Sequence, residues 1–191
     1  NSQKEARDPS LLRLFGLFCE KYGDFLLPQM ELLFSFLFIP TMNIITNADE
    51  MCSSFGNDGS CDSFDEDVIN MHRSYLLSFI DGTVKGCIDF VASFNESTLN
   101  SFVETIQFLI SFLNKQDIAS KSIKILAGFV ESVRLNASQE FISDFASNYG
   151  VPLVVDSFRI VTDPCYNFAF NEICGLIVQL LKLPLLNENA P

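Results

Sequence analysis

The segment LNSFVETIQFLISFL, residues 99–113, decides the fold class of this chain. Its apolar side chains fall at offsets of 0, 3, 4, 7, 10, 11 and 14 residues, and they are Leu99, Phe102, Val103, Ile106, Leu109, Ile110 and Leu113. An α-helix has about 3.6 residues per turn, so this spacing gathers all of them on one face. The segment therefore predicts an amphipathic helix that buries one apolar stripe against its neighbours.

The same pattern recurs on both sides of this segment. Residues 117–134 repeat the stripe with Ala119, Ile123, Leu126, Val130 and Val133. Toward the N-terminus, Asp8–Pro9 is a helix start signal, and Tyr22–Asp24 predicts the break that ends that first helix. A second helix is expected from Phe25 to Pro40, and a third is expected to begin near Glu66.

The C-terminal half predicts further helices joined by short connections. A short apolar segment occupies residues 87–94, and Asn136–Gln139 resembles a capping box that opens a helix. The β-branched segment Val151–Val161 is compatible with a strand or a helix, and we interpret it as a helix. Asp163–Pro164 then caps a last long helix that is expected to end near Lys182.

These elements predict an all-α fold with about seven main helices, paired in units of roughly 35 to 45 residues. An α-α superhelix of the HEAT or armadillo type accounts for an apolar stripe on each helix, for the short turns and for the lack of an obvious central site. A closed helical bundle is the alternative architecture. We treat residues 1–191 as one repeat segment.

Composition narrows the range of functions. The chain has 191 residues, of which 48% are hydrophobic and 19% charged, and 24 acidic residues outweigh 12 Lys and Arg to give a net charge of −12. So apolar a chain is not a disordered tail. Its negative charge argues against a stand-alone nucleic-acid module, which needs a basic surface.

Residues 47–67 differ from the rest of the chain. They contain seven acidic residues, no Lys or Arg, and several Gly and Ser, which predicts a flexible acidic insertion. With Gly59 at the sixth position of an EF-hand loop, Ser54 would be first and Asp65 last. That loop needs Asp first and normally Glu last, so the match to a calcium site fails.

The sequence contains little that indicates catalysis. His72 is the single histidine, and we interpret it as a surface or capping residue rather than a general base or metal ligand. No nucleophile elbow, zinc-protease motif or phosphate-binding loop is present. We therefore expect a protein that is not an enzyme and that has no cofactor and no bound metal.

The cysteines and the apolar segments indicate a reducing compartment without membrane insertion. The six cysteines, Cys19, Cys52, Cys61, Cys87, Cys165 and Cys174, form no C-x-x-C pair and are expected to be free thiols. The longest apolar stretch, Phe25–Ile39, has 15 residues and is interrupted by polar ones, so it is too short to span a bilayer. The first residues show no signal peptide.

Basic residues concentrate around one predicted helix. Lys115, Lys121, Lys124 and Arg134 lie within 20 residues, and Lys121 and Lys124 share a helical face away from the apolar stripe. Two ammonium groups on one face can approach a phosphate, although an ordinary solvated face has the same appearance. On charge alone, these four residues are the candidates for contact with a nucleic-acid backbone.

The order of the helices also resembles a known family. Arg73-Ser74-Tyr75 with Phe79, Ala119-Ser120-Lys121-Ser122, the segment Phe141–Pro152 and the segment Phe25–Met30 are similar to the C-terminal HEAT repeats of the exportin-T family. This family exports tRNA within the importin-β (karyopherin-β) superfamily. The resemblance covers residues 10–182, with an insertion at 47–67 that is longer and more acidic than the family's own.

The resemblance implies a nuclear export receptor that binds tRNA together with Ran-GTP, contacts nuclear pore proteins and shuttles between nucleus and cytoplasm. Ran-GTP would bind mainly to N-terminal repeats outside this chain, while the C-terminal repeats would help wrap tRNA by shape and backbone charge. Two alternatives stay open. One is an exportin-1-type receptor, which carries proteins with leucine-rich export signals, and the other is a helical-repeat scaffold without a transport role.

Overall fold

The computed structural model describes residues 10–54, 66–113 and 115–184. These ranges contain helices and short connections and no strand, so the predicted all-α fold is confirmed. The elements are α1 (Ser10–Leu33), η1 (Phe34–Phe38), α2 (Ile39–Ser54), α3 (Glu66–Gly86), α4 (Ile88–Ala92), α5 (Glu96–Ile110), α6 (Gln116–Asn136), α7 (Gln139–Phe145), η2 (Ala146–Gly150), α8 (Val151–Thr162), η3 (Pro164–Ala169) and α9 (Phe170–Leu180).

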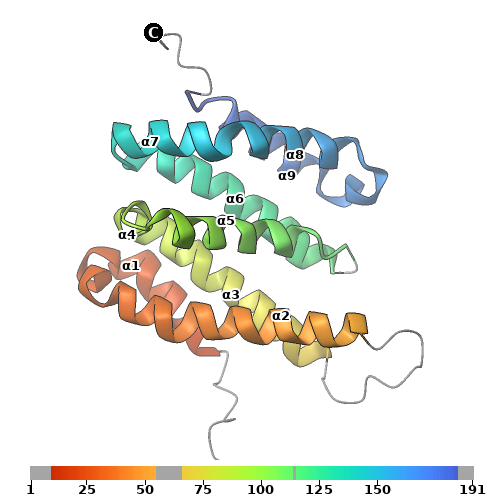
Figure 1. Ribbon diagram of the computed structural model, residues 1–191, viewed down its shortest axis with the longest axis horizontal. Coiled ribbons are helices and arrows are strands. Elements are labelled where there is room, and N and C mark those ends of the chain that lie inside the picture. Colours follow the sequence, from red (N-terminus) through yellow and green to blue (C-terminus); the bar gives the residue numbers. More distant parts are fainter. Residues whose placement is uncertain (1–9, 55–65, 114, 185–191) are drawn as a thin grey trace, which may run out of the picture.

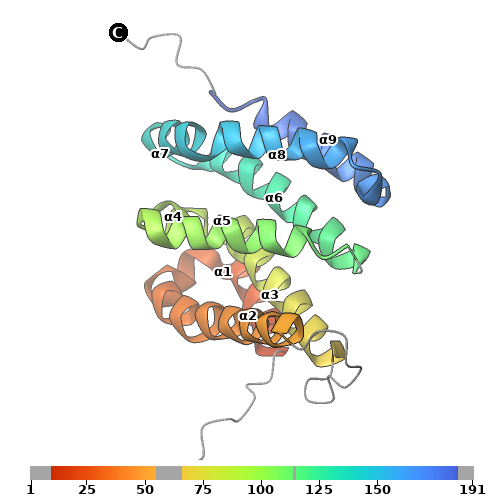
Figure 2. The same ribbon diagram turned by 45° about the vertical axis from the view of Figure 1, so that its right-hand side comes forward.

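The helices alternate between two layers of a stack (Figure 1). We call the layer that contains α2, α5 and the α7–α8 rod the front layer. The back layer contains α3, α6, α9 and the first half of α1, up to a kink at Tyr22. The two layers stay separate when the view is turned by 45° (Figure 2). A chain that passes repeatedly between two layers is the arrangement expected of a helical-repeat solenoid.

The predicted stripes form the core. Six of the seven stripe residues of α5 and all five of α6 are buried, and Leu113 is half-buried. Phenylalanine rings connect the repeats, with centroid distances of 5.9 Å from Phe38 to Phe102, 5.5 Å from Phe102 to Phe129 and 5.3 Å from Phe129 to Phe145. This continuous row of rings, in tilted and edge-to-face pairs, explains the large number of phenylalanines in the chain.

Of the two helix boundaries predicted at the N-terminal end, one is confirmed and one differs. The break near Tyr22 is confirmed by its non-helical backbone (φ −135°, ψ 27°). The second helix, however, does not end at Pro40 but continues through α2 to Ser54. The π-helical stretch η1 lies directly before it, and the N–H of Ile39 bonds to the carbonyl of Phe34, five residues back. This wider hydrogen-bonding pattern lets the helix accommodate a proline, which lacks an N–H.

The same arrangement occurs a second time in the front layer. The π-helical stretch η2 ends at Gly150, and Pro152 follows in the first turn of α8, so both π-helical stretches precede a proline by two residues. Val151–Val161 is helical, as expected. The cap of α7 is Ser138 rather than Asn136, because α6 runs through Asn136 and the Ser138 side chain accepts the N–H of Phe141.

The predicted acidic insertion at 47–67 is partly helical. Its first residues lie in α2, which ends at Ser54, and its last residues, Glu66 and Asp67, form the first turn of α3. Two carboxylates in a first turn favour helix formation, because they face the positive end of the helix dipole. The middle of the insertion, residues 55–65, lies outside the described residues.

The closest helix packing in the described residues joins α1 to α3. A Cβ atom built on Gly82 would overlap the carbonyl oxygen of Gly16, and one built on Gly86 would overlap the carbonyl oxygen of Cys19. Gly16 and Gly23 stand in the same relation to the backbone of α3. The two helices therefore touch backbone to backbone, which side chains larger than hydrogen would prevent.

We expect Gly82→Ala to lower the free energy of unfolding by at least 1 to 3 kcal/mol, a typical cost of overpacking, because the new methyl group has to push two backbones apart. Gly128→Ala is the matched control. It lies within α6, and a Cβ atom there meets nothing within 4 Å. Its greater helix propensity should stabilise the protein by about 0.5 to 1 kcal/mol.

Urea unfolding followed by circular dichroism measures both variants. Equal stability of Gly82→Ala and the wild type would show that α1 and α3 do not pack in this way.

Candidate binding site

The four basic residues predicted to contact nucleic acid surround α6, and each has a definite environment. Lys121 is half-buried between α6 and α3, where its Nζ donates to Ser78 Oγ at 2.8 Å and lies 3.4 Å from the carbonyl oxygen of Ser74. Desolvation by burial lowers the pKa of Lys121, and its like-charged neighbours Arg13 and Lys85 add to the effect. Lys121 thus links two back-layer helices.

Two other members of this set form ion pairs within the back layer. Lys124 lies 3.2 Å from Glu172 of α9, and Lys115 lies 3.4 Å from Glu66 of α3. A hydrogen bond to its own backbone N–H, followed by the bond to Lys124, lowers the pKa of Glu172. Arg134 is half-buried in the last turn of α6, where a cation is favoured by the helix dipole.

Basic residues are unevenly divided between the two layers. In the described ranges, nine of ten Lys and Arg lie on or beside back-layer helices: Arg13, Lys21, Arg73, Lys85, Lys115, Lys121, Lys124, Arg134 and Lys182. The tenth, Arg159 of α8, lies 3.1 Å from Asp156. The front-layer helices contain six acidic residues with described side chains: Glu31, Glu96, Glu104, Glu140, Asp144 and Asp156. The front layer is therefore the acidic face of the stack.

His72 does not lie on the surface, contrary to the expectation from sequence. Its side chain is 4% exposed, and its Nδ1 is 2.8 Å from the carbonyl oxygen of Val68, one turn earlier in α3. A bond to a backbone carbonyl satisfies a ring nitrogen without any catalytic partner. No group of three or more His, Cys, Asp or Glu side chains suited to a metal ion occurs in the described part of the chain.

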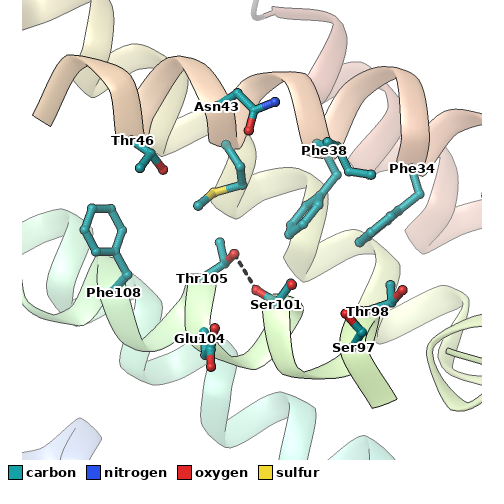
Figure 3. Close-up of a pocket in the computed structure, with 12 residues that line it drawn as sticks. Phe34, Phe38, Asn43, Thr46, Ser97, Thr98, Ser101, Glu104, Thr105 and Phe108 are labelled. Atoms are coloured by element: carbon teal, nitrogen blue, oxygen red, sulfur yellow. Dashed lines mark hydrogen bonds between the residues drawn. The ribbon is translucent and has the colours of Figure 1, made fainter. Parts of the chain in front are cut away.

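A cavity opens in the front layer between α2 and α5 (Figure 3). It has a volume of about 650 Å³ and lies between Phe34 and Phe38 of η1, which leads into α2, and Phe108 of α5. Met42 contributes a flexible apolar wall, and Ser97, Thr98, Ser101 and Thr105 line the α5 side with hydroxyl groups. We call this cavity the α2–α5 groove.

The groove exists because the two layers are packed with different spacing. In the back layer, α3 packs closely on α1, α6 on α3, and α9 on α6. In the described residues, no comparably close backbone packing joins α2 to α5 or α5 to α8, and each of these helices packs instead on the back layer. A stack with one tight layer and one open layer leaves grooves between the helices of the open layer.

Of two further cavities in the front layer, one adjoins the α2–α5 groove, and the other shares Phe94 with that adjoining cavity. The adjoining cavity, of about 390 Å³, shares Phe34, Ile39 and Thr98 with the groove and reaches Glu31 and Phe90. The next, of about 410 Å³, lies between α5 and α7 and has three carboxylates in its lining, Glu96, Glu140 and Asp144, together with Phe94 and Phe141. The front layer therefore presents neighbouring cavities with apolar walls and acidic edges.

Sequence analysis missed the α2–α5 groove, although one signal of it was visible. Helix residues Phe25, Leu32, Phe36 and Ile39 are exposed, while Met30, Phe34 and Phe38 on the same rod are buried. A helix that is apolar all round is usually covered on more than one side. Which of its faces lines a groove depends on the spacing between the helices, and no local pattern encodes that spacing.

The helical stretch Phe25–Asn47 is long and apolar enough to cross a membrane by length and composition. The shorter segment expected from sequence, Phe25–Ile39, lengthens because the helix passes Pro40. The expectation that this stretch is too short to span a bilayer is therefore wrong. In this fold the stretch supplies Met30, Phe34, Phe38 and Ile45 to the core, while only 28% of its apolar window is buried.

Four of the six cysteines have described side chains, and all four are free thiols, as predicted: Cys19, Cys87, Cys165 and Cys174. Cys19 is buried between α1 and α3 with its Sγ 3.6 Å from the sulfur of Met30. A hydrogen bond with the Cys87 side chain is the main cause of a lowered Cys19 pKa. The side chains of Cys52 and Cys61 lie outside the described residues.

Residues 64–189 match the family model described as CRM1 C terminal. This range spans the helices from α3 to α9 and about two thirds of the chain. The chain belongs to the CRM1 C-terminal family. The match supports a relation to the karyopherin exportins, as the resemblance implied, but it does not support the exportin-T family in particular. A comparison with curated proteins found no match.

For this member of the CRM1 C-terminal family, the ion pair between Lys124 and Glu172 predicts a pH-dependent contribution to stability. The folded-state pKa of Glu172 is lowered, so its contribution is present above the unfolded pKa and is lost as pH falls through the folded pKa. We expect Glu172→Gln to lower the free energy of unfolding at pH 7 by less than about 1 kcal/mol, because Lys124 is largely exposed.

The difference between Glu172→Gln and the wild type should shrink as pH is lowered from 7 toward 4, as measured by urea unfolding at each pH. Glu131→Gln, on the exposed side of α6, removes the same charge and serves as the control. A difference that is independent of pH would contradict the assigned role of Glu172.

Proposed function

We propose that this chain is the C-terminal helical-repeat segment of a karyopherin exportin, and that it binds partners without catalysing a reaction. The match of residues 64–189 to the CRM1 C-terminal family is the observation that supports this function. The two-layer stack supports it as well, because helical-repeat proteins of this kind use extended surfaces rather than an enclosed pocket to bind their partners.

We further propose that the cargo is protein rather than tRNA. Three of the four candidate cations already have protein partners: Lys121 with α3, Lys124 with Glu172, and Lys115 with Glu66. A contact of the tRNA backbone with any of these three would have to compete with that interaction, and the net charge of −12 would oppose the approach of a polyanion. The exportin-1-type alternative is therefore the better supported interpretation.

Ran-GTP and nuclear pore proteins belong to this proposal as partners of the whole receptor, and shuttling between nucleus and cytoplasm follows from them. Ran-GTP and cargo would each favour the same curvature of the helical stack. By thermodynamic linkage, each ligand then raises the affinity for the other by the same factor.

The test measures the affinity of the full-length protein that carries this chain for two labelled cargoes, with and without Ran-GTP, at a fixed salt concentration. One cargo is a peptide with a leucine-rich export signal and the other is tRNA. We expect Ran-GTP to raise the affinity for the peptide by about 5-fold or more, a typical allosteric coupling, and to leave that for tRNA unchanged.

If Ran-GTP raises the affinity for tRNA instead, the cargo is tRNA. If Ran-GTP changes the affinity for neither the peptide nor tRNA, the chain belongs to a helical-repeat scaffold without an export role.

A charge-reversal variant gives the tRNA interpretation a separate test. If tRNA contacts the back layer, Lys124→Glu should weaken tRNA binding at low salt, and the loss should diminish as salt is raised. Lys124 is the better choice over Lys121, because its side chain is largely exposed whereas Lys121 is half-buried between α6 and α3. Glu172→Gln, which also removes the Lys124–Glu172 ion pair but keeps the lysine, is the control for the loss of that pair. For the protein cargo that we propose, Lys124→Glu should leave the Ran-dependent binding of the peptide unchanged.

A further inference from the structure

We propose that the α2–α5 groove docks an amphipathic helix of a partner protein, with an apolar face toward the groove and Lys or Arg along its flanks. This inference deepens the proposed function by naming the chemistry of a protein ligand. It rests on the proposed function in taking that ligand to be a protein. The groove itself is defined by the geometry of the front layer.

The walls of the groove suit apolar side chains. Phe34, Phe38 and Phe108 offer ring faces and edges, and Met42 can adjust its shape between them (Figure 3). A volume of about 650 Å³ falls within the usual range of roughly 300 to 1,000 Å³ for protein binding cavities. Helix-in-groove recognition uses anchors at intervals of three, four and seven residues, which suits a long apolar groove.

The length of the groove fits a helix of about four turns. The groove and the adjoining cavity of about 390 Å³ share Phe34, Ile39 and Thr98, so they form one continuous trough. Along the continuous helical stretch from the end of α1 through η1 into α2, the lining extends from Glu31 to Thr46. This corresponds to about 22 Å at a rise of 1.5 Å per residue. A partner helix of about 15 residues would cover this distance.

One exposed apolar side chain lines the trough and would lose water contact when it is filled, and two more are exposed on the same run of helix. Ile39 lines both cavities and is 49% exposed, and its neighbours Leu32 and Phe36 are 58% and 52% exposed. Contiguous exposed apolar residues on a folded protein typically mark an interaction surface.

The charge of the front layer decides the sign of the partner. Glu104 lies in the lining of the groove and Glu31 in that of the adjoining cavity, while Glu96, Glu140 and Asp144 line the neighbouring cavity. The single described front-layer cation, Arg159, is close to Asp156. Complementary charge therefore favours a basic partner helix.

The same acidic face disfavours a membrane as the occupant. Anionic lipid headgroups attract basic protein surfaces, and the carboxylates around the trough would be repelled by them. A basic amphipathic helix satisfies both the apolar walls and the acidic edges, whereas a lipid surface satisfies only the first.

The test uses three labelled 18-residue peptides and the 191-residue chain without Ran-GTP, with affinities measured by fluorescence anisotropy. The first peptide has Leu on one helical face and Lys elsewhere, the second has Glu in place of Lys, and the third has the Leu and Lys positions scrambled. We expect the first peptide to bind at least tenfold more tightly than the other two.

Two groove variants should each weaken the binding of the Leu/Lys peptide at least tenfold. Ser101→Trp fills the groove from an exposed position on α5, and Ile39→Asn removes an exposed apolar wall. Their matched controls are Ser147→Trp and Val155→Asn, which make the same kinds of change at exposed front-layer positions outside the described cavities. The controls should change the affinity by less than twofold.

Circular dichroism of each variant establishes that the helical fold is retained. The proposal is overturned if the Glu-containing peptide binds as tightly as the Lys-containing one, if the first peptide does not bind, or if the controls weaken binding as much as the groove variants. It is also overturned if the groove variants abolish binding to vesicles with anionic lipid while leaving peptide binding intact.

These outcomes can be told apart from a failure of the proposed export function, because Ran-GTP is absent from this experiment. A chain that binds the Leu/Lys peptide in its groove but shows no Ran-dependent cargo binding would retain the groove and lose the export role.

Discussion

The structure depends on the backbone contact between α1 and α3. At Gly82 and Gly86 the two helices approach so closely that a methyl group would overlap a carbonyl oxygen of α1. Such an approach shortens the distance between the first two back-layer helices, and the next two follow with close packing of α6 on α3 and α9 on α6. The glycines permit the close approach of α1 and α3. The row of phenylalanine rings then connects the back layer to the front layer.

The open front layer is the counterpart of this tight back layer. Helices α2, α5 and α8 rest on the back layer without comparably close packing among themselves in the described residues, so side chains rather than backbones form the walls between them. The α2–α5 groove and its neighbouring cavities result from this difference in spacing.

The front and back layers differ in the sign of their charge as well as in the spacing of their helices. Nearly all described cations lie on the back layer, yet Lys115, Lys121 and Lys124 each interact with a residue of a neighbouring back-layer helix. These contacts link neighbouring back-layer helices, and an external polyanion would have to compete with them. The front layer has an excess of carboxylates beside apolar cavities, and this combination favours a basic protein ligand over nucleic acid or anionic lipid.

The sequence by itself determined the all-α class, the order of the helices, the stripes that form the core and the relation to exportins. The fold class, the helices and the stripes follow from local spacing, because apolar residues at intervals of three and four specify both a helix and its buried face. The relation to exportins came from the resemblance of particular segments to that family, and the family match supports it. The passage of a helix through Pro40, the burial of His72 and the partners of Lys121 and Lys124 could not be read from it. The helix passes Pro40 through the π-helical hydrogen bonding of η1. The burial of His72 and the partners of Lys121 and Lys124 depend instead on which residues of distant segments become neighbours, and only the tertiary packing of the back-layer helices decides that.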